Sequence, residues 1–305
     1  MNAYPALVRD TGDLQEGHGP MTALAIDIGG TKFAAALAEP DGTLGEPCEL
    51  PVGDDPTATL HALLDRIASE PVKAVGIGSA GPLDPLAGTV SPVNIPAWRG
   101  FPLVAEVARR FPGRPVRLAG DAQCMALGEW WRGGTGHDDL LGIVVSTGVG
   151  GGLVLGGRPY FGAAGNAGFL GHIVVDPSGD PCPCGQTGCL ETVASGPSMV
   201  RRALAKGWTP TTPHPDARAL AESARAGSPQ ALAAFTEAAT ALATVITTTA
   251  TLLDLSHTVI GGGLAAASDL LLPPLRAALP ARLTVSPTTL HRTAGLHGAA
   301  ALTFT

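Results

Sequence analysis

Four side chains between residues 172 and 189 have the types and the spacing of a metal site. His172, Cys182, Cys184 and Cys189 follow the pattern H-x9-C-x-C-x4-C, with prolines and glycines bending the backbone between them. One imidazole and three thiolates suit a tetrahedral Zn²⁺, and four protein ligands leave no open position for hydrolytic chemistry. Disulfides or unrelated cysteines are the alternative, but such clustering in an apparently intracellular chain favours a metal. The pattern predicts a structural zinc site.

A second stretch, residues 27–32, has the composition of a phosphate-binding turn. An apolar run from residue 23, a glycine turn and a second apolar run over 33–38 predict a β-hairpin. Asp27 lies at the end of the first strand, and Gly29, Gly30 and Thr31 allow the backbone to approach a phosphate closely. The spacing is not that of a Walker A loop, and a plain hairpin turn is the alternative.

The same design recurs at residues 140–155, where a strand, a glycine turn and a second strand follow one another. Backbone N–H groups of this turn and the Thr147 hydroxyl can surround phosphate oxygens. A third glycine turn follows a predicted strand over 257–260. A different pattern, the G-x-G-x-x-G of Gly76, Gly78 and Gly81, is rejected as a dinucleotide site because prolines replace the helix that would have to follow.

Taken in order, these motifs resemble the ROK family (repressors, open reading frames and sugar kinases) of the actin and hexokinase superfamily. The segment GNAGFLGH at 165–172 runs into CPCGQTGCLE at 182–191, residues 93–100 match an N-x-P-x-W segment, and GDAQ at 120–123 matches N-D-A-N. The resemblance covers residues 23 to 303. It implies a two-domain, actin-like (ribonuclease H-like) α/β fold of the sugar-kinase type with a structural zinc site, the two domains facing a common cleft.

The resemblance implies three parts of the chain. These are a flexible leader over 1–21, an N-terminal domain over 22–118 plus 288–305, and a C-terminal domain with the zinc motif over 119–287. Helices are expected over about 57–69, 101–111, 120–131, 191–206, 215–226 and 228–253, and strands over 73–77 and 116–119, with strand and helix pieces in 281–303.

The resemblance also implies a role for single residues. Asp121 is the catalytic base that accepts the proton of the sugar hydroxyl, although an aspartate there could be only a helix N-cap. His172 binds zinc through one ring nitrogen and faces the sugar, and Asp27 holds Mg²⁺ through water. The sugar-binding residues are Gly81, Asn94, Asp121, Phe169, His172 and Glu191. The ATP- or phosphate-binding residues are Asp27, Gly29, Gly30, Thr31, Lys32, Thr147, Gly148, Gly150, Gly262 and Gly263. Trp98 of the N-x-P-x-W segment is expected to pack in the core.

Two departures from the family bear on the sugar. The asparagine before the catalytic aspartate is Gly120 here, and the glutamate of E-x-G-H is Phe169. Each lost group would reach the middle of a glucose ring, so we expect a hexose altered at C2 or C3. Kanosamine is the first expectation, followed by N-acetylmannosamine and N-acetylglucosamine. A glucokinase and a non-catalytic sugar sensor are the alternatives, and a donor other than ATP stays open.

Composition limits the remaining classes. The chain of 305 residues has a formal net charge of -7 and shows no basic stripe, which argues against nucleic acid as a partner. No uninterrupted apolar run is long enough for a membrane span, and residues 1–20 do not resemble a secretory signal. These residues are also too few for a DNA-binding module. We therefore expect a cytoplasmic enzyme that binds ATP, Mg²⁺, Zn²⁺ and a sugar, and the resemblance implies a homodimer or homotetramer.

Overall fold

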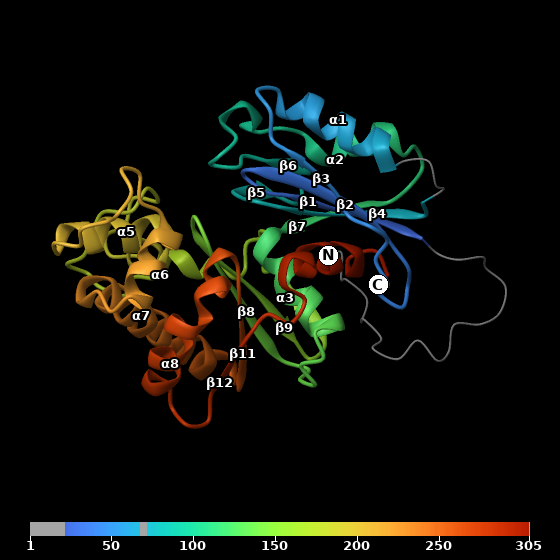
Figure 1. Cartoon of the computed structure of the whole chain (residues 1–305). Helices are drawn as coiled ribbons and strands as arrows, with labels where there is room; N and C mark the ends of the chain where they lie inside the picture. The colour runs from blue at the N-terminus through green and yellow to red at the C-terminus, as the bar shows by residue number, and fades with distance from the viewer. Residues whose placement is uncertain (1–21, 68–71, 305) are drawn as a thin grey trace. The chain divides into compact units, whose positions relative to one another are not determined.

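The computed structural model describes residues 22–67 and 72–304 (Figure 1). These residues form two compact units. The first unit contains the described residues up to Asp138, together with Gly152–Gly168 and those from Thr289 onward. The second contains Asp139–Gly151 and Phe169–Thr288. The leader expected over 1–21 lies outside the described residues.

A five-stranded sheet organises the first unit, in the order β3-β2-β1-β4-β7. Strands β1 (Ala23–Ile28) and β2 (Lys32–Ala38) pair antiparallel, as the predicted hairpin requires, and β3 (Cys48–Pro51) pairs with the outer edge of β2. Strands β4 (Ala74–Ser79) and β7 (Val116–Gly120) continue the sheet parallel to β1. The carboxyl ends of β1, β4 and β7 therefore meet at one edge. A separate two-stranded sheet pairs β5 (Leu83–Asp84) with β6 (Thr89–Val90).

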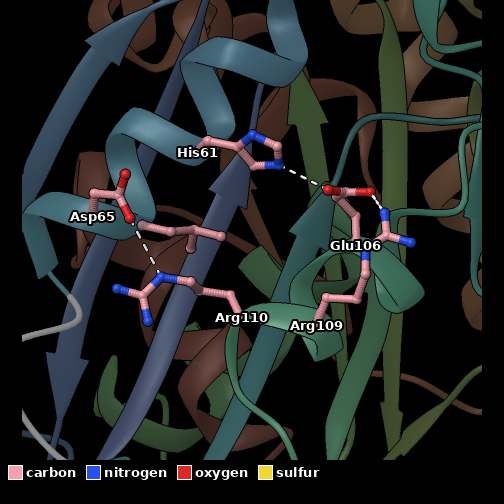
Figure 2. Close-up of a pocket in the computed structure, with 6 residues that line it drawn as sticks. His61, Asp65, Glu106, Arg109 and Arg110 are labelled. Carbon is pink, nitrogen blue, oxygen red and sulfur yellow. Dashed lines mark hydrogen bonds and ion pairs between the residues drawn. The ribbon is translucent and has the colours of Figure 1, made fainter.

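Helices α1 (Pro56–Ile67) and α2 (Leu103–Arg110) are joined by polar contacts at the rim of a pocket of about 320 Å³ (Figure 2). The His61 ring nitrogen Nε2 lies 2.7 Å from Glu106 Oε1, and Arg110 Nε donates to Asp65 Oδ1 at 3.3 Å. A second arginine of α2, Arg109, pairs with the other oxygen of Glu106. The charged side chains of this pocket are thus paired with one another, and none belongs to the predicted site.

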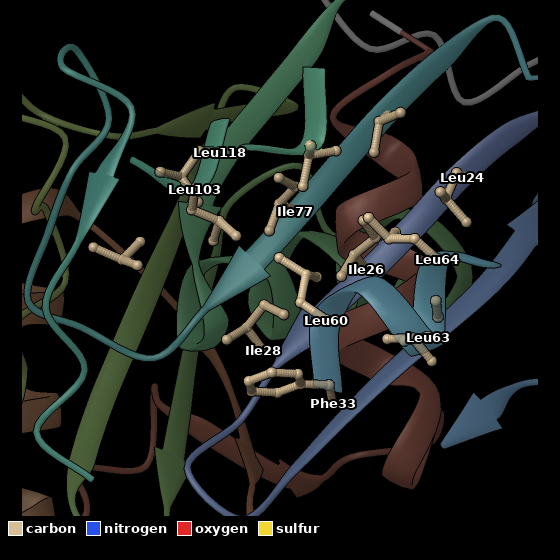
Figure 3. Packing of buried hydrophobic residues seen from close by; sticks show 14 of the residues in the cluster. Leu24, Ile26, Ile28, Phe33, Leu60, Leu63, Leu64, Ile77, Leu103 and Leu118 are labelled. Atoms are coloured by element: carbon tan, nitrogen blue, oxygen red, sulfur yellow. The ribbon is translucent and has the colours of Figure 1, made fainter. Parts of the chain in front are cut away.

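The core of the first unit lies between its sheet and these two helices (Figure 3). Alternate residues of β1 point to this side, and they meet residues of α1 spaced three and four apart, which is the pattern of a buried helix face. The residues involved are Leu24, Ile26 and Ile28 of β1, and Leu60, Leu63 and Leu64 of α1. Burying one such side chain contributes about 1.5–3 kcal/mol.

Trp98 is a core residue, as predicted. It stacks between Phe33, with ring centroids 5.2 Å apart, and Phe101, at 4.3 Å. Its indole Nε1–H donates to Thr57 Oγ1 at 3.0 Å, so burial leaves no polar atom of the ring unpaired.

The opposite face of the first sheet is covered by α3 (Asp121–Arg132) and α9 (Ala294–Ala301). A Cβ on Gly76 of β4 would lie 1.8 Å from the carbonyl oxygen of Ala299, and one on Gly78 would lie 3.1 Å from Cys124 Sγ. These glycines let the helices approach the sheet, which explains the G-x-G pattern without a nucleotide. The element that follows β4 is strand β5 and not a helix, as the prolines after Gly81 predicted.

A second five-stranded sheet repeats the first, in the order β10-β9-β8-β11-β12. Its strands are β8 (Leu140–Val145), β9 (Val149–Leu155), β10 (Arg158–Tyr160), β11 (His257–Gly261) and β12 (Thr284–Pro287). Strand β11 runs parallel to β8 and β12, and β10 runs antiparallel to β9, as β3 does to β2 in the first sheet. The duplication expected from the glycine turns is therefore present in the strand order.

Helices of the second unit follow the prediction except at two places. The helix expected over 191–206 is two helices, α4 (Glu191–Ala194) and α5 (Gly196–Ala205). Ser195 separates them because its backbone is extended and its hydroxyl accepts a hydrogen bond from the N–H of Ser198, as an N-cap does. Helix α8 (Ser268–Ala278) was not predicted, because Pro273 and Pro274 lie inside it.

Helices α6 (Ala217–Arg225) and α7 (Pro229–Leu253) agree with the prediction, and Ser228 is the N-cap of α7. By length and composition α7 could cross a membrane, but 56% of its most apolar window is buried and it packs against α4, α5, α6 and α8. Short 3₁₀ turns complete the described elements, at Pro96–Trp98, Leu170–His172, Gly263–Ala267 and His291–Thr293.

The two units differ from the domain boundaries expected from sequence, apart from a shift of one residue at Thr288, in two stretches. The sequence places residues 119–138 and 152–168 in the second domain, whereas in the structure they group with the first unit. For residues 119–138 the reason is the packing of α3 against α9 and β4, because α9 returns from the end of the chain to the first sheet.

Candidate active site

Two carboxylates lie at the edge where the parallel strands of the first sheet end. Asp27 is the fifth residue of β1, and Asp121 directly follows β7. Burial, and after it the charge of Asp121, raise the pKa of Asp27 to about 7 against the opposing effect of Lys32. Burial also raises the pKa of Asp121 to about 6. Two acidic groups with elevated pKa values at the carboxyl edge of a sheet are typical of a site of chemistry.

Asp121 is the first residue of α3 and not its N-cap, which is Gly120. Its Oδ1 accepts a hydrogen bond of 2.7 Å from the backbone N–H of Ala122, which lowers the pKa of the carboxyl group and partly offsets burial. The interpretation of Asp121 as an ordinary N-cap is therefore wrong. A carboxylate held at a helix N-terminus is also stabilised by the helix dipole.

The first glycine turn lies close to Asn94, as the predicted sugar and phosphate residues require. A Cβ on Gly30 would lie 2.7 Å from Asn94 Nδ2, and Gly29 N–H donates to the Lys32 carbonyl at 3.1 Å. The Gly81 carbonyl accepts from the N–H of Val93, next to Asn94 in the chain. Lys32 differs from the expectation in one respect, because its ammonium group forms an ion pair with Glu49.

Gln123 has a structural role between two of the motifs that the sequence analysis missed. Its side-chain Nε2 donates to the carbonyls of Gly165, at 3.1 Å, and Ala167, at 2.8 Å, while its Oε1 accepts from the Gly120 N–H at 2.9 Å. The amide thereby joins the segment that carries Asp121 to the segment that leads to Phe169. The signal was present in the GDAQ motif, of which Gln123 is the fourth residue.

The second and third glycine turns lie together in the second unit. Ser146 N–H donates to the Gly148 carbonyl, and the Ser146 carbonyl accepts from Gly196 N–H at 2.9 Å. A Cβ on Gly262, where φ is +89°, would lie 2.4 Å from the Val145 carbonyl oxygen, and one on Gly263 would lie 3.3 Å from Ser146 Oγ. Only glycine permits this approach of the third turn to the second.

Glu191 points at the second glycine turn. Its Oε2 accepts from the backbone N–H of Val149 at 2.9 Å, and a Cβ on Gly148 would lie 2.6 Å from the same oxygen. Glu191 therefore connects the turn that carries Thr147 and Gly150 to the start of α4, directly after the cysteine cluster.

His172, Cys182, Cys184 and Cys189 come together as the spacing predicts. One ligand atom from each lies within 4.8 Å of all the others. His172 Nδ1 lies 3.6 Å from Cys182 Sγ, and the Sγ atoms of Cys184 and Cys189 are 3.6 Å apart. Zn–S bonds of about 2.3 Å give an edge of about 3.8 Å in a tetrahedron, so these separations fit one zinc ion.

The environment of the thiols agrees with a cation among them. A hydrogen bond from the backbone of Gln186 lowers the pKa of the Cys184 thiol to about 6. Burial raises the pKa of Cys189 to about 12 and raises that of Cys182 as well. With no cation present, Cys182 and Cys189 are therefore protonated, and three thiolates would form here only around a positive ion such as a divalent metal.

Phe169 lies beside this cluster. Its ring stacks on the His172 imidazole with centroids 6.0 Å apart and an angle of 19° between the planes, and 43% of the side chain is exposed. Because Nδ1 points to the cysteine cluster, the phenyl ring presents an apolar surface beside the rest of the imidazole.

The predicted site residues thus form two groups. The first unit contains Asp27, Gly29, Gly30, Thr31, Lys32, Gly81, Asn94 and Asp121. The second unit contains Thr147, Gly148, Gly150, Phe169, His172, Glu191, Gly262 and Gly263.

Comparison with known proteins identifies the class to which this fold and these motifs belong. The model of the ROK family matches residues 23–304. The structure is similar to that of a ROK family glucokinase from Streptomyces griseus in complex with glucose and AMPPNP, with a TM-score of 0.79 and 32% identity over 92% of this chain and 99% of that chain.

The chain belongs to the ROK family. It is 34% identical to a glucokinase of Thermotoga maritima over 273 residues, which are 83% of this chain and 85% of that protein. It is 37% identical to an N-acetylmannosamine kinase of Shigella boydii over 293 residues, which are 92% of this chain and 98% of that protein.

Proposed function

We propose that this chain is an ATP-dependent sugar kinase that transfers the γ-phosphoryl group to the 6-hydroxyl of a hexose. The observation that supports this most directly is Asp121, a half-buried carboxylate with a raised pKa at the start of α3, in a chain whose relatives include kinases for glucose and for N-acetylmannosamine. With a pKa of about 6 it is mostly ionised at pH 7 and still basic enough to accept a proton.

In this reaction the bond between the γ-phosphorus and the bridging oxygen of ATP breaks, a bond from phosphorus to the sugar O6 forms, and ADP leaves. The transition state of phosphoryl transfer is loose, so the hydroxyl proton moves late. Asp121 orients the hydroxyl and receives that proton. General-base assistance of this kind contributes about 10²- to 10⁴-fold to the rate.

Asp27 is the residue that would hold Mg²⁺, through water. The pKa of its carboxyl group is raised to about 7. A divalent cation nearby would favour the ionised carboxylate and would lower this pKa again. Mg²⁺ would neutralise phosphate charge when bound. The first and second glycine turns would donate backbone N–H groups to the phosphates, and Gly262 and Gly263 would lie against adenosine. For Lys32 to contact a phosphate directly, its ammonium group would have to leave the ion pair with Glu49.

For the cysteine cluster we propose a structural Zn²⁺ bound by His172, Cys182, Cys184 and Cys189. The donor set is closed, and His172 contributes Nδ1 in this geometry. A metal on Nδ1 would fix the tautomer with hydrogen on Nε2, so that Nε2 donates to a sugar hydroxyl.

For the sugar we propose an N-acetylhexosamine, with N-acetylmannosamine first. An exposed phenyl ring beside His172 suits the methyl of an acyl group and offers no acceptor to a ring hydroxyl. Kanosamine, the first expectation from sequence, is now the weaker candidate. Its cationic amine would need a carboxylate where Phe169 stands, and the relatives named above act on glucose and N-acetylmannosamine.

A sugar panel tests this proposal. Sugar-dependent ADP release with Mg-ATP would be measured for N-acetylmannosamine, N-acetylglucosamine, glucose, mannose and kanosamine. We expect the highest kcat/KM for N-acetylmannosamine. A preference for glucose would establish the glucokinase alternative, which the glucokinase relatives favour, and would refute the role given to Phe169. Repeating the panel with polyphosphate would test the donor.

A non-catalytic sugar sensor is the second alternative, and it predicts sugar binding without ADP release. The half-buried Asp27 and Asp121 argue against it, because elevated pKa values cost stability that a sensor has no need to sacrifice. Since the reaction uses ATP and the metal site uses reduced thiols, we place the protein in the cytoplasm.

A further inference from the structure

Arg225, the last residue of α6, is bonded to two neighbouring parts of the second unit. Its guanidinium binds the carboxylate of Asp269 in two places, with Nε donating to Oδ2 at 2.9 Å and Nη2 donating to Oδ1 at 2.7 Å. The same Nη2 also donates to the backbone carbonyl of Ala266 at 3.1 Å. Such a bidentate pair fixes both the distance and the direction of its partner, which a single ion pair does not.

The two partners of Arg225 lie at the end of the third glycine turn. Ala266 belongs to the 3₁₀ turn Gly263–Ala267, and Asp269 lies in the first turn of α8, which begins at Ser268. The helix dipoles favour the pair, because a cation ends α6 and an anion begins α8. Hydrogen bonds from Arg225 also lower the pKa of the Asp269 carboxyl group, so both partners are charged at neutral pH.

The beginning of the third glycine turn is held in a different way. Gly262 has a φ of +89°, and a Cβ there would lie 2.4 Å from the Val145 carbonyl oxygen. The Ala265 N–H donates to the Gly262 carbonyl at 3.0 Å and closes the turn. Because a glycine backbone is the least restricted of all, contacts at both ends are needed to fix such a turn. Packing at Gly262 supplies the first contact, and Arg225 supplies the second.

The other end of α6 lies beside the second glycine turn. Ala217 is the first residue of α6, and a Cβ on Gly196, at the start of α5, would lie 3.1 Å from the Ala217 Cβ. The Gly196 N–H donates to the Ser146 carbonyl of the second turn at 2.9 Å. Helix α6 therefore contacts the surroundings of both turns, with its first residue beside Gly196 and its last residue bonded to Ala266.

We propose that Arg225 is a positioning residue for the nucleotide, because it fixes the third glycine turn where adenosine would lie. The inference rests on the proposed function, which places adenosine against Gly262 and Gly263. Arg225 acts through the turn, since its Nε and Nη2 are both directed at Asp269 and Ala266. A turn that is already held in place loses less conformational freedom when a ligand binds, and preorganisation of this kind increases affinity. Loss of Arg225 should therefore weaken nucleotide binding and leave sugar binding unchanged.

Substitution of Arg225 tests the proposal. Arg225→Met keeps an apolar stem of similar length and removes the guanidinium. We expect the dissociation constant of Mg-ADP, measured by calorimetry, and KM for ATP to rise about three- to tenfold. The value of kcat, and KM for the sugar with the highest kcat/KM in the panel, should stay within about twofold of the parent. Arg225→Lys keeps the charge without the planar fork, so its affinity for Mg-ADP should lie between those of the parent and Arg225→Met.

The matched control is Lys206→Met, which removes another cation at the end of a helix. Lys206 is the C-cap of α5 and pairs with Glu237 of α7, so the affinity for Mg-ADP should not change. The proposal is overturned if Arg225→Met binds Mg-ADP as tightly as the parent, or if KM for the sugar rises as much as KM for ATP. An equal loss of Mg-ADP affinity in Lys206→Met would also overturn it. A parent that binds no Mg-ADP would overturn the proposed function, and this inference with it, whereas the preceding results would leave the proposed function intact.

Discussion

At the scale of single residues, the carboxyl group of Asp121, which we propose as the base of the reaction, lies in an environment that opposes its negative charge. Burial raises its pKa to about 6, while the hydrogen bond from Ala122 and the start of α3 keep the ionised form accessible. A base must be ionised to accept a proton, so protonation removes activity. The activity is therefore expected at and above neutral pH and lost as the pH falls through about 6.

A pH profile checks this sign. At saturating Mg²⁺, kcat/KM should fall about tenfold for each pH unit below about 6, because one proton neutralises one base. Thermal stability measured over the same range separates titration from acid unfolding. A profile that stays level down to pH 4.5 would contradict the role of Asp121.

Phe169 gives a second prediction at this scale, about specificity. Phe169→Glu restores an acceptor for ring hydroxyls and removes an apolar surface, so kcat/KM for glucose relative to N-acetylmannosamine should rise about ten- to hundredfold. Phe169→Leu is the matched control, because it keeps an apolar side chain and should change the ratio little. The same panel of sugars measures both variants. An unchanged ratio in Phe169→Glu would show that position 169 does not select the sugar.

Most of the single-residue roles proposed here come from short motifs, whereas contacts with distant partners could not be predicted from them. The cluster of His172 with three cysteines follows from spacing alone, and the structure brings it together. Gln123 could not be assigned in the same way, because its amide hydrogen-bonds to carbonyls more than forty residues away. Likewise, no local pattern shows that Lys32 pairs with Glu49.

At the scale of elements, the approach of α9 to the first sheet depends on glycine in β4. A Cβ on Gly76 would lie 1.8 Å from the Ala299 carbonyl oxygen, which is backbone and cannot rotate away. Gly76→Ala should therefore destabilise the protein by about 1–3 kcal/mol through overpacking and lower Tm by several degrees.

The control for this prediction is Gly53→Ala. Its added Cβ would meet only the Thr59 hydroxyl, at 3.5 Å, and the position is exposed. Scanning calorimetry of the two variants beside the parent compares them directly. Equal Tm values for Gly76→Ala and the parent would contradict this prediction, because they would mean that α9 can move away from the sheet without loss of stability.

Elements with strong periodicity were predictable, and the exceptions have local causes. The hairpin of β1 and β2 and the long helix α7 follow from apolar patterning and from caps such as Ser228. The break between α4 and α5 was missed because Ser195 reads as an ordinary helix residue until its hydroxyl is seen to cap Ser198. Helix α8 was missed because two prolines usually end a helix.

At the scale of the whole molecule, the four proposed zinc ligands join parts of the chain that have little regular structure. Residues 173–190 form no helix or strand of their own, and isolated bridges pair Val174 with Cys189 and Pro181 with Thr187. Zinc would supply the stability that packing does not. Cys184→Ser should therefore lose the bound zinc, lower Tm and lose activity together, because His172 would no longer be oriented.

Zinc content by atomic emission and Tm by calorimetry would be measured for this variant. Cys48→Ser is the control, since Cys48 lies on β3 and outside the cluster. Full activity and unchanged Tm in a zinc-free Cys184→Ser protein would contradict a structural metal.

The duplicated architecture was predictable at this scale, whereas the grouping of α3 was not. Two strand–turn–strand patterns indicated two related sheets, and the strand orders agree. The sequence order placed α3 after the boundary at residue 118, but its packing partner α9 lies more than 160 residues later. Long-range packing of this kind leaves no trace in local periodicity.

The central claim is that this chain is a kinase whose base is Asp121, and one variant tests it most directly. Asp121→Asn keeps the size and one acceptor of the side chain but cannot accept the proton. The measurement is phosphorylated sugar by phosphorus NMR, beside the sugar dissociation constant by calorimetry. We expect phosphoryl transfer by the parent, a loss of about 10²- to 10⁴-fold in the variant, and sugar binding within a few-fold of the parent. A parent that binds sugar and forms no sugar phosphate, or a variant that keeps the full rate, would contradict the claim.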